Sequence, residues 1–93
     1  MEITNEILIN KGFKSDNPKN VLTTFYIMNK TKPEWRISLS RQYLPYSNKL
    51  TYNCDCWLCN DKGVIIKRAS LSDVNTLEDL SSLIKLCNID YQI

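Results

Sequence analysis

Two stretches of the chain place an apolar residue at every second position. In WRISLS (35–40) the apolar positions are Trp35, Ile37 and Leu39. In LTYNCDCWL (50–58) the same spacing puts five residues on one face: Leu50, Tyr52, Cys54, Cys56 and Leu58. Alternation with a period of two is typical of a strand that buries only one face. The two stretches therefore predict an antiparallel sheet with one apolar face and one polar face.

Two further segments extend this sheet. VLTTFYIMN (21–29) is rich in β-branched and aromatic residues and predicts a strand. GVIIKRASL (63–71) overlaps the turn sequence NDKG at its glycine and predicts a fourth strand. GFKSDNPKN (12–20) consists mainly of turn-forming residues, and RQYLPYSNK (41–49) contains Pro45. We therefore predict that the first of these segments is a turn, and that the second is a loop or a broken edge strand.

Helix signals flank the predicted strands. Thr4 is a favourable N-cap and Gly12 a favourable terminator, which predicts a short helix over 5–11. Asn75 or Thr76 is expected to cap a second helix. Its apolar residues recur at helical spacing: Leu77, Leu80, Leu83, Ile84 and Cys87.

The predicted order is helix, four strands, helix. Short connections between the strands favour a four-stranded antiparallel meander. Two amphipathic helices would cover its apolar face, which predicts an α+β fold. Since 93 residues suffice for one modest core, we expect a single domain, 1–93.

Three cysteines lie within CDCWLC (54–59), and the fourth is Cys87. Four thiolates match a structural zinc site in number, but only Cys56 and Cys59 have the C-x2-C spacing. Cys54 and Cys56 share the predicted apolar face, and free cysteine packs as a small hydrophobe. We therefore expect core cysteines without a metal or other cofactor, and Cys59, near the turn, as the most exposed thiol. The alternatives are a zinc-stabilised interaction domain that uses all four, and redox or disulfide chemistry of the thiols.

Residue types needed for catalysis are scarce. The chain has no histidine, which removes the commonest general base. Gly12 and Gly63 are its only glycines, so a glycine-rich phosphate loop is excluded. We expect a non-enzymatic protein.

Charge is distributed unevenly along the chain. Residues 11–49 carry eight basic and two acidic groups, a local balance of +6, although the net charge is only +2. Aromatic residues interleave with these cations, a pattern that also occurs in nucleic-acid-binding sheets. A nucleic-acid-binding module that uses the basic 11–49 half is therefore an alternative function.

Exposed aromatic residues point to a protein partner. Trp57 falls opposite the apolar face of its strand, and Tyr43 and Tyr46 flank Pro45. Tryptophan and tyrosine are frequent anchors of protein interfaces. We predict an accessory protein that binds another protein, and a homodimer is compatible with the sequence. The candidate contacts are Trp57, Tyr43, Tyr46, Lys30, Lys32 and Arg41.

Neither a secretory signal nor a membrane-spanning segment is recognisable in the sequence. The N-terminal residues MEITNEILINKG lack the basic start and continuous apolar stretch of a secretory signal. Every apolar run is far shorter than the roughly 18 residues of a spanning helix. We expect a cytoplasmic protein without a membrane partner.

The terminal segments, ITNEILINKGF (3–13) and VNTLEDLSSLIKLCNID (74–90), carry a resemblance. They resemble short uncharacterised proteins common in gut anaerobes and their phages. Those proteins begin with a helix followed by Gly-Phe and end in V-x-T-x-x-x-L-x-x-x-x-x-L-C-G-I, where this chain has Asn88 in place of the glycine. Asparagine also tolerates the left-handed conformation. The resemblance implies an α+β fold and a phage or mobile-element origin, and it implies no activity. The matching residues are Val74, Thr76, Leu80, Leu86, Cys87 and Ile89.

Overall fold

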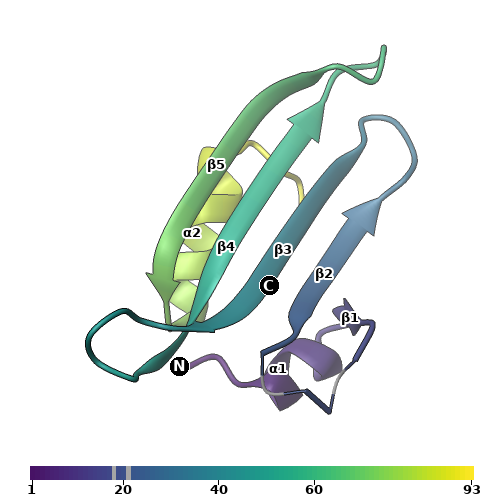
Figure 1. Cartoon of the computed structure of the whole chain (residues 1–93). Helices are drawn as coiled ribbons and strands as arrows, with labels where there is room; N and C mark the ends of the chain where they lie inside the picture. The colour runs from purple at the N-terminus through teal and green to yellow at the C-terminus, as the bar shows by residue number, and fades with distance from the viewer. Residues whose placement is uncertain (18, 21) are drawn as a thin grey trace.

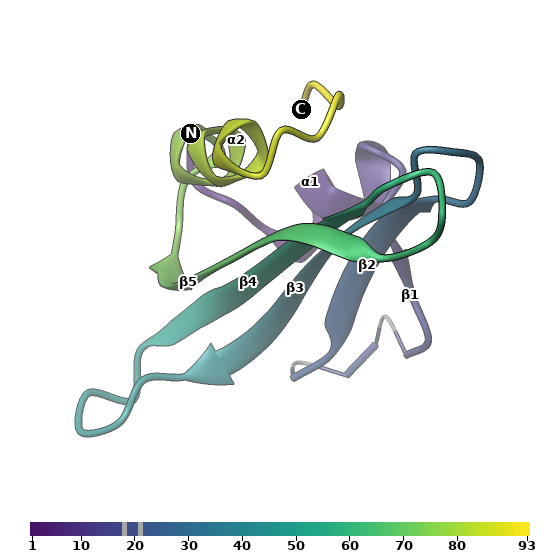
Figure 2. The same ribbon diagram turned by 90° about the horizontal axis from the view of Figure 1, so that it is seen from above.

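The computed structural model of the chain describes residues 1–17, 19–20 and 22–93, and Pro18 and Val21 of the predicted turn and strand lie outside the described residues. The described part forms an α+β fold with a five-stranded antiparallel sheet in the order β1-β2-β3-β4-β5. Both helices lie on the same face of this sheet (Figures 1 and 2). The elements are α1 (Asn5–Asn10), β1 (Lys14–Ser15), β2 (Thr24–Asn29), β3 (Trp35–Tyr43), β4 (Leu50–Cys59), β5 (Ile65–Val74) and α2 (Leu77–Leu86).

The predicted α+β class is confirmed, but the predicted number of strands is wrong. The additional strand is β1, which lies in the segment predicted to be a turn. Lys14 pairs with Tyr26 and Ser15 with Phe25, so β1 forms one edge of the sheet. A strand of two residues has no alternation that could be recognised in a sequence.

The prediction of a loop or a broken edge strand over 41–49 is wrong at its first three residues, which belong to the central strand β3. β3 continues to Tyr43 because Arg41, Gln42 and Tyr43 pair with the first residues of β4. Pro45 lacks a backbone N–H and restricts its own φ and the residue before it, but it lies beyond the last residue of β3 and leaves this pairing intact. At the other side of the sheet, β5 runs to Val74, three residues beyond the predicted end.

Both helices have the predicted capping interactions. The Thr4 hydroxyl accepts a hydrogen bond from Ile7 N (3.2 Å), and the Thr76 hydroxyl accepts one from Asp79 N (3.1 Å). Gly12 and Asn88 adopt left-handed φ values of 95° and 57° after the two helices. These caps stabilise helices that are too short to persist alone. Neither helix in the described part of the chain is long and apolar enough to cross a membrane.

The core lies between the helices and the face of the sheet that they cover, called the inner face here. On β3 and β4 the inner face follows the predicted alternation, since Ile37 pairs with Cys56 and Leu39 with Cys54. Leu8 of α1 and Leu80 of α2 are fully buried in the same cluster. The buried core residues are Ile3, Leu8, Phe13, Phe25, Trp35, Ile37, Leu39, Tyr52, Cys54, Cys56, Val74, Leu80, Leu83, Ile84, Cys87 and Ile89.

Candidate interaction surface

The face of the sheet opposite the helices is uncovered by any other described element (Figure 2). Residues in register on adjacent strands stand side by side, so this face carries ordered rows of side chains. One row runs from β2 to β5 and has Trp57 between Arg36 and Arg68. The next row, which also runs from β2 to β5, is mainly polar. Eight residues define this surface, called the open face: Tyr26, Met28, Arg36, Ser38, Asp55, Trp57, Arg68 and Ser70.

Trp57 lies within the open face, as the alternation of β4 predicts. It pairs with Arg36 on β3 and with Arg68 on β5, and its side chain is half-buried. The Arg36 guanidinium carbon lies 5.1 Å from the centroid of the Tyr26 ring, a cation–π contact. The open face therefore presents two aromatic rings, Trp57 between Arg36 and Arg68, and Tyr26 in contact with Arg36.

Arg36 and Arg68 differ in their partners. Arg68 donates to both carboxylate oxygens of Asp55, at 3.3 Å and 3.1 Å. Ser70 Oγ donates to Asp55 Oδ1 at 2.7 Å. Among the described residues, Arg36 Nε is buried and has no hydrogen-bond partner. The positive charge of Arg68 is therefore compensated within the molecule, whereas Arg36 keeps a hydrogen-bond donor unused.

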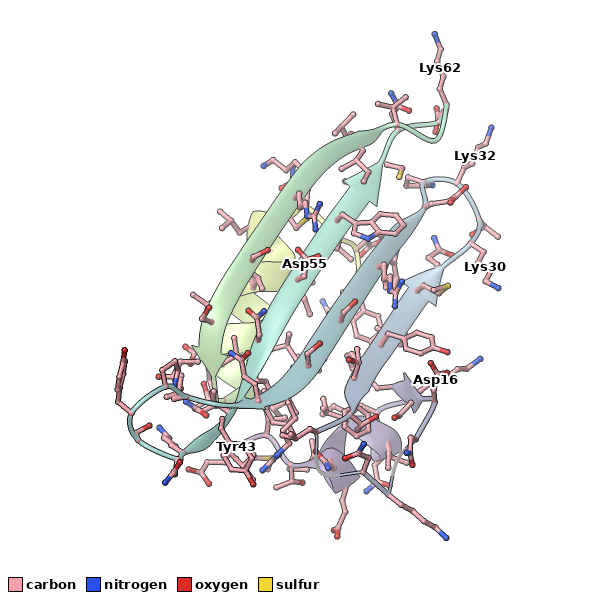
Figure 3. The ribbon with its side chains drawn as sticks, viewed as in Figure 1. Asp16, Lys30, Lys32, Tyr43, Asp55 and Lys62 are labelled. Atoms are coloured by element: carbon pink, nitrogen blue, oxygen red, sulfur yellow. The ribbon has the colours of Figure 1, made fainter. Side chains whose placement is uncertain are left out.

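Asp55 is ionised over the physiological pH range. Burial alone would raise its pKa, but the hydrogen bonds from Arg68 and Ser70 outweigh this effect and lower the pKa below its ordinary value. Asp55 lies near the middle of the open face (Figure 3). Its negative charge pairs with the Arg68 guanidinium, beside Trp57.

The other exposed candidates lie at opposite ends of the sheet. Lys30 and Lys32 are exposed in the β2–β3 connection, close to the end of the sheet that also carries Lys62 (Figure 3). Tyr43 is 52% exposed at the far end of β3, and Tyr46 is fully exposed in the β3–β4 connection. The candidates predicted from sequence thus form no common site, and only Trp57 belongs to the open face.

Arg41 has a different environment from the one expected for a surface contact. Its Nη1 donates to Asn5 Oδ1 of α1 (3.3 Å) and to Tyr52 Oη, and its guanidinium carbon lies 4.8 Å from the centroid of the Tyr52 ring. Burial raises the pKa of Tyr52, although Arg41 opposes this effect. Arg41 therefore connects the first helix to the inner face, and we leave it out of the candidate surface.

The basic residues of 11–49 do not form a single patch. Lys30 and Lys32 lie at one end of the sheet, whereas Lys49 lies at the other end, where its carbonyl accepts a hydrogen bond from Leu44 N. Arg41 is engaged with Asn5 on the helix-covered side. Lys49 and Arg41 are therefore separated from Lys30 and Lys32, which weakens their combined electrostatic effect on an anionic partner. Lys14 and Lys30, by contrast, line the same pocket beside Tyr26.

Three cysteines occupy the core position that the sequence predicts. Cys54, Cys56 and Cys87 are buried and free, and the sulfurs of Cys54 and Cys56 are 3.9 Å apart. The contact with Cys56 and burial raise the pKa of Cys54, and burial raises the pKa of Cys87. Thiols with raised pKa values are weak nucleophiles and poor metal ligands at neutral pH. Among the described residues, no group of three or more potential metal ligands is close enough to hold an ion.

Cys59 contradicts the expectation of an exposed thiol. It is buried, with only 5% of its surface exposed. β4 continues through this residue, whose backbone N–H donates to the carbonyl of Glu34 (2.8 Å) and which pairs with Ile65. The strand thus ends one residue later than the alternation of 50–58 predicts, and Cys59 is part of it.

Sequence reasoning missed Arg68 as a member of the candidate surface. The alternation of 35–40 places Arg36 opposite Trp35, so this residue could be assigned to the polar face. GVIIKRASL shows no clean alternation, and its pairing with β4 has two register shifts. Only the pairing of Trp57 with Arg68 shows which residues of β5 belong to the open face.

Comparison of the chain with family models, curated proteins and solved structures finds no match. The candidate surface is therefore defined by its geometry and its chemistry. The resemblance of the terminal segments to proteins of gut anaerobes and their phages stays a prediction.

Proposed function

We propose that this chain is a small, non-enzymatic accessory protein of the cytoplasm that binds another protein through the open face of its sheet. The observation that supports this function is the position of Trp57 on the uncovered face, between Arg36 and Arg68. Tryptophan, tyrosine and arginine are the residues that most often dominate the binding energy of protein interfaces. All three types occur together on this surface.

The charge of the open face indicates the chemistry of the partner. Asp55 compensates Arg68, whereas Arg36 forms no ion pair with the described residues, and its buried Nε has no hydrogen-bond partner there. A planar guanidinium binds a carboxylate through two parallel hydrogen bonds. We therefore propose a partner surface that presents an apolar or aromatic group to Trp57 and a carboxylate to Arg36. The resemblance of the terminal segments supports a partner from a phage or from its host.

The test compares variants of the open face with a matched control. Trp57→Ala and Arg36→Ala are expected to reduce recovery of one defined partner at least about tenfold in quantitative affinity enrichment, whereas Tyr46→Ala retains it. The melting temperature of Trp57→Ala should stay close to that of the wild type. A partner that all three variants retain equally would contradict the proposal, and a large loss of stability would show that Trp57 is part of the core.

Single-stranded nucleic acid is a second candidate ligand of the same surface. The contact of Arg36 with the Tyr26 ring, next to Trp57, resembles the stacking platforms of single-strand-binding sheets. Titration with an oligonucleotide should then quench tryptophan fluorescence, and binding should weaken steeply as salt increases. An unchanged fluorescence signal at low ionic strength would exclude this candidate and leave the protein partner.

A further inference from the structure

The edge strands at the two sides of the sheet differ in length. At one edge, β1 has only two residues, and very short edge strands discourage pairing with other chains. At the other edge, β5 has ten residues and pairs with β4 on one side only among the described elements. An edge strand of this length presents a row of unpaired backbone N–H and carbonyl groups. β5 is therefore the edge that can accept a further strand.

Apolar side chains accompany this free edge. Val64, directly before β5, and Ile65 and Ile66 at its start are between 49% and 57% exposed, and Leu71 is 42% exposed farther along. A shallow, mainly apolar groove lies between β5 and α2. Burying such side chains against a partner removes apolar surface from water. The groove is lined by Ser70, Leu71, Asp79, Ser82, Leu83 and Leu86.

The charges along this edge are of opposite sign at its two ends. Lys67, near the start of β5, donates from Nζ to the carbonyl of Leu86 at 3.3 Å. Asp79, in the first turn of α2, lines the groove together with Leu71, toward the other end of β5. An antiparallel arrangement of two such edges brings the positive end of each against the negative end of the other. The edge is thus complementary to itself.

We infer that two copies of this chain associate through β5, antiparallel to each other about a two-fold axis perpendicular to the sheet. The two sheets then become continuous, and both α2 helices lie on the same side. The apolar grooves meet near the axis, where they bury Leu71 and Leu86 of both copies. Lys67 of each copy lies toward Asp79 of the other. The occupant of the free edge is therefore a second copy, and the open face is left available for the partner proposed above.

Charge reversal at the edge tests this arrangement. Sedimentation velocity over a range of concentrations should show a monomer–dimer equilibrium for the wild type. Lys67→Glu and Asp79→Lys each place like charges opposite one another and are expected to raise the dimer dissociation constant at least about tenfold. An equimolar mixture of these two variants should form a heterodimer, because each then supplies the charge that the other lacks.

Controls separate this inference from loss of folding and from the open face. Lys32→Glu, in the β2–β3 connection, and Trp57→Ala should leave the dimer dissociation constant unchanged. Leu71→Lys should favour the monomer, and the melting temperatures of all variants show whether they are folded. A wild type that stays monomeric at every concentration would overturn the inference. A dimer that persists in Lys67→Glu, Asp79→Lys and Leu71→Lys would place the interface elsewhere and overturn it equally.

Discussion

The two faces of β4 contrast sharply although their residues alternate along a single strand. Cys54 and Cys56 point to the inner face and are fully buried. Asp55 and Trp57 point to the open face, where both side chains remain partly exposed. Neighbouring residues therefore have different environments: one set packs in the core, and the other belongs to the open face that we propose as the partner-binding surface. Substitutions on the inner face should change stability, and substitutions on the open face should change binding.

The largest difference between the faces should appear in thiol reactivity. The four native cysteines are buried, so native protein should react with a bulky thiol reagent at least about 10³-fold more slowly than unfolded protein, because labelling requires local opening. Asn53→Cys places a thiol on the exposed side of β4 and should add one rapidly reacting group. Mass spectrometry of timed samples counts the modified cysteines. Rapid modification of the native thiols would contradict the core assignment.

Truncation of an inner-face residue should have the next largest effect. Leu39 is fully buried and pairs with Cys54, so Leu39→Ala is expected to reduce the free energy of unfolding by about 2–5 kcal/mol. Ser40, the next residue on β3, faces the other side and shares a 3.0 Å hydrogen bond with the Thr24 hydroxyl. Ser40→Ala should cost less than about 1 kcal/mol. Urea denaturation measures both values, and similar losses would refute the assignment of the faces.

Substitution of a core cysteine by serine tests whether the native sulfur packs as an apolar group. Cys56→Ser introduces a hydroxyl beside Cys54 and should reduce the free energy of unfolding by about 1–3 kcal/mol. Cys56→Ala removes the sulfur without adding a polar atom and is the matched control. The serine variant should be at least as unstable as the alanine variant, although serine is larger. A serine variant as stable as the wild type would show that the site tolerates polarity.

The smallest effect is expected from the ion pair on the open face. The folded-state pKa of Asp55 is lowered, so its contribution to stability is complete above the unfolded-state pKa of about 3.9 and is lost as the pH falls through the folded-state pKa. Because the pair is partly exposed and screened by solvent, Asp55→Asn should cost less than about 1 kcal/mol at pH 7. The difference in unfolding free energy between this variant and the wild type should vanish at low pH. A constant difference across the titration would exclude the ionised carboxylate as its cause.

Local patterns in the sequence predicted the fold class and most of the elements. The alternation of 35–40 and 50–58 assigned each side chain to the correct face, because strand geometry itself requires this alternation. Capping residues marked the two helices for an equally local reason, since the N-cap hydroxyl binds a backbone N–H only three residues away. The burial of Cys54 and Cys56 followed from the strand alternation of 50–58. The burial of Cys87 followed from the helical spacing of apolar residues along 77–87.

Pairing between distant segments decided what the sequence left open. β1, the last residues of β3 and the end of β5 are strands because a neighbouring strand accepts their backbone hydrogen bonds, and no local pattern records that neighbour. The composition of the open face has the same origin, since Trp57 meets Arg36 and Arg68 only through register. The sequence by itself therefore determined which face of each central strand is apolar. The tertiary structure decided which side chains stand together, because contacts between strands depend on the path of the chain.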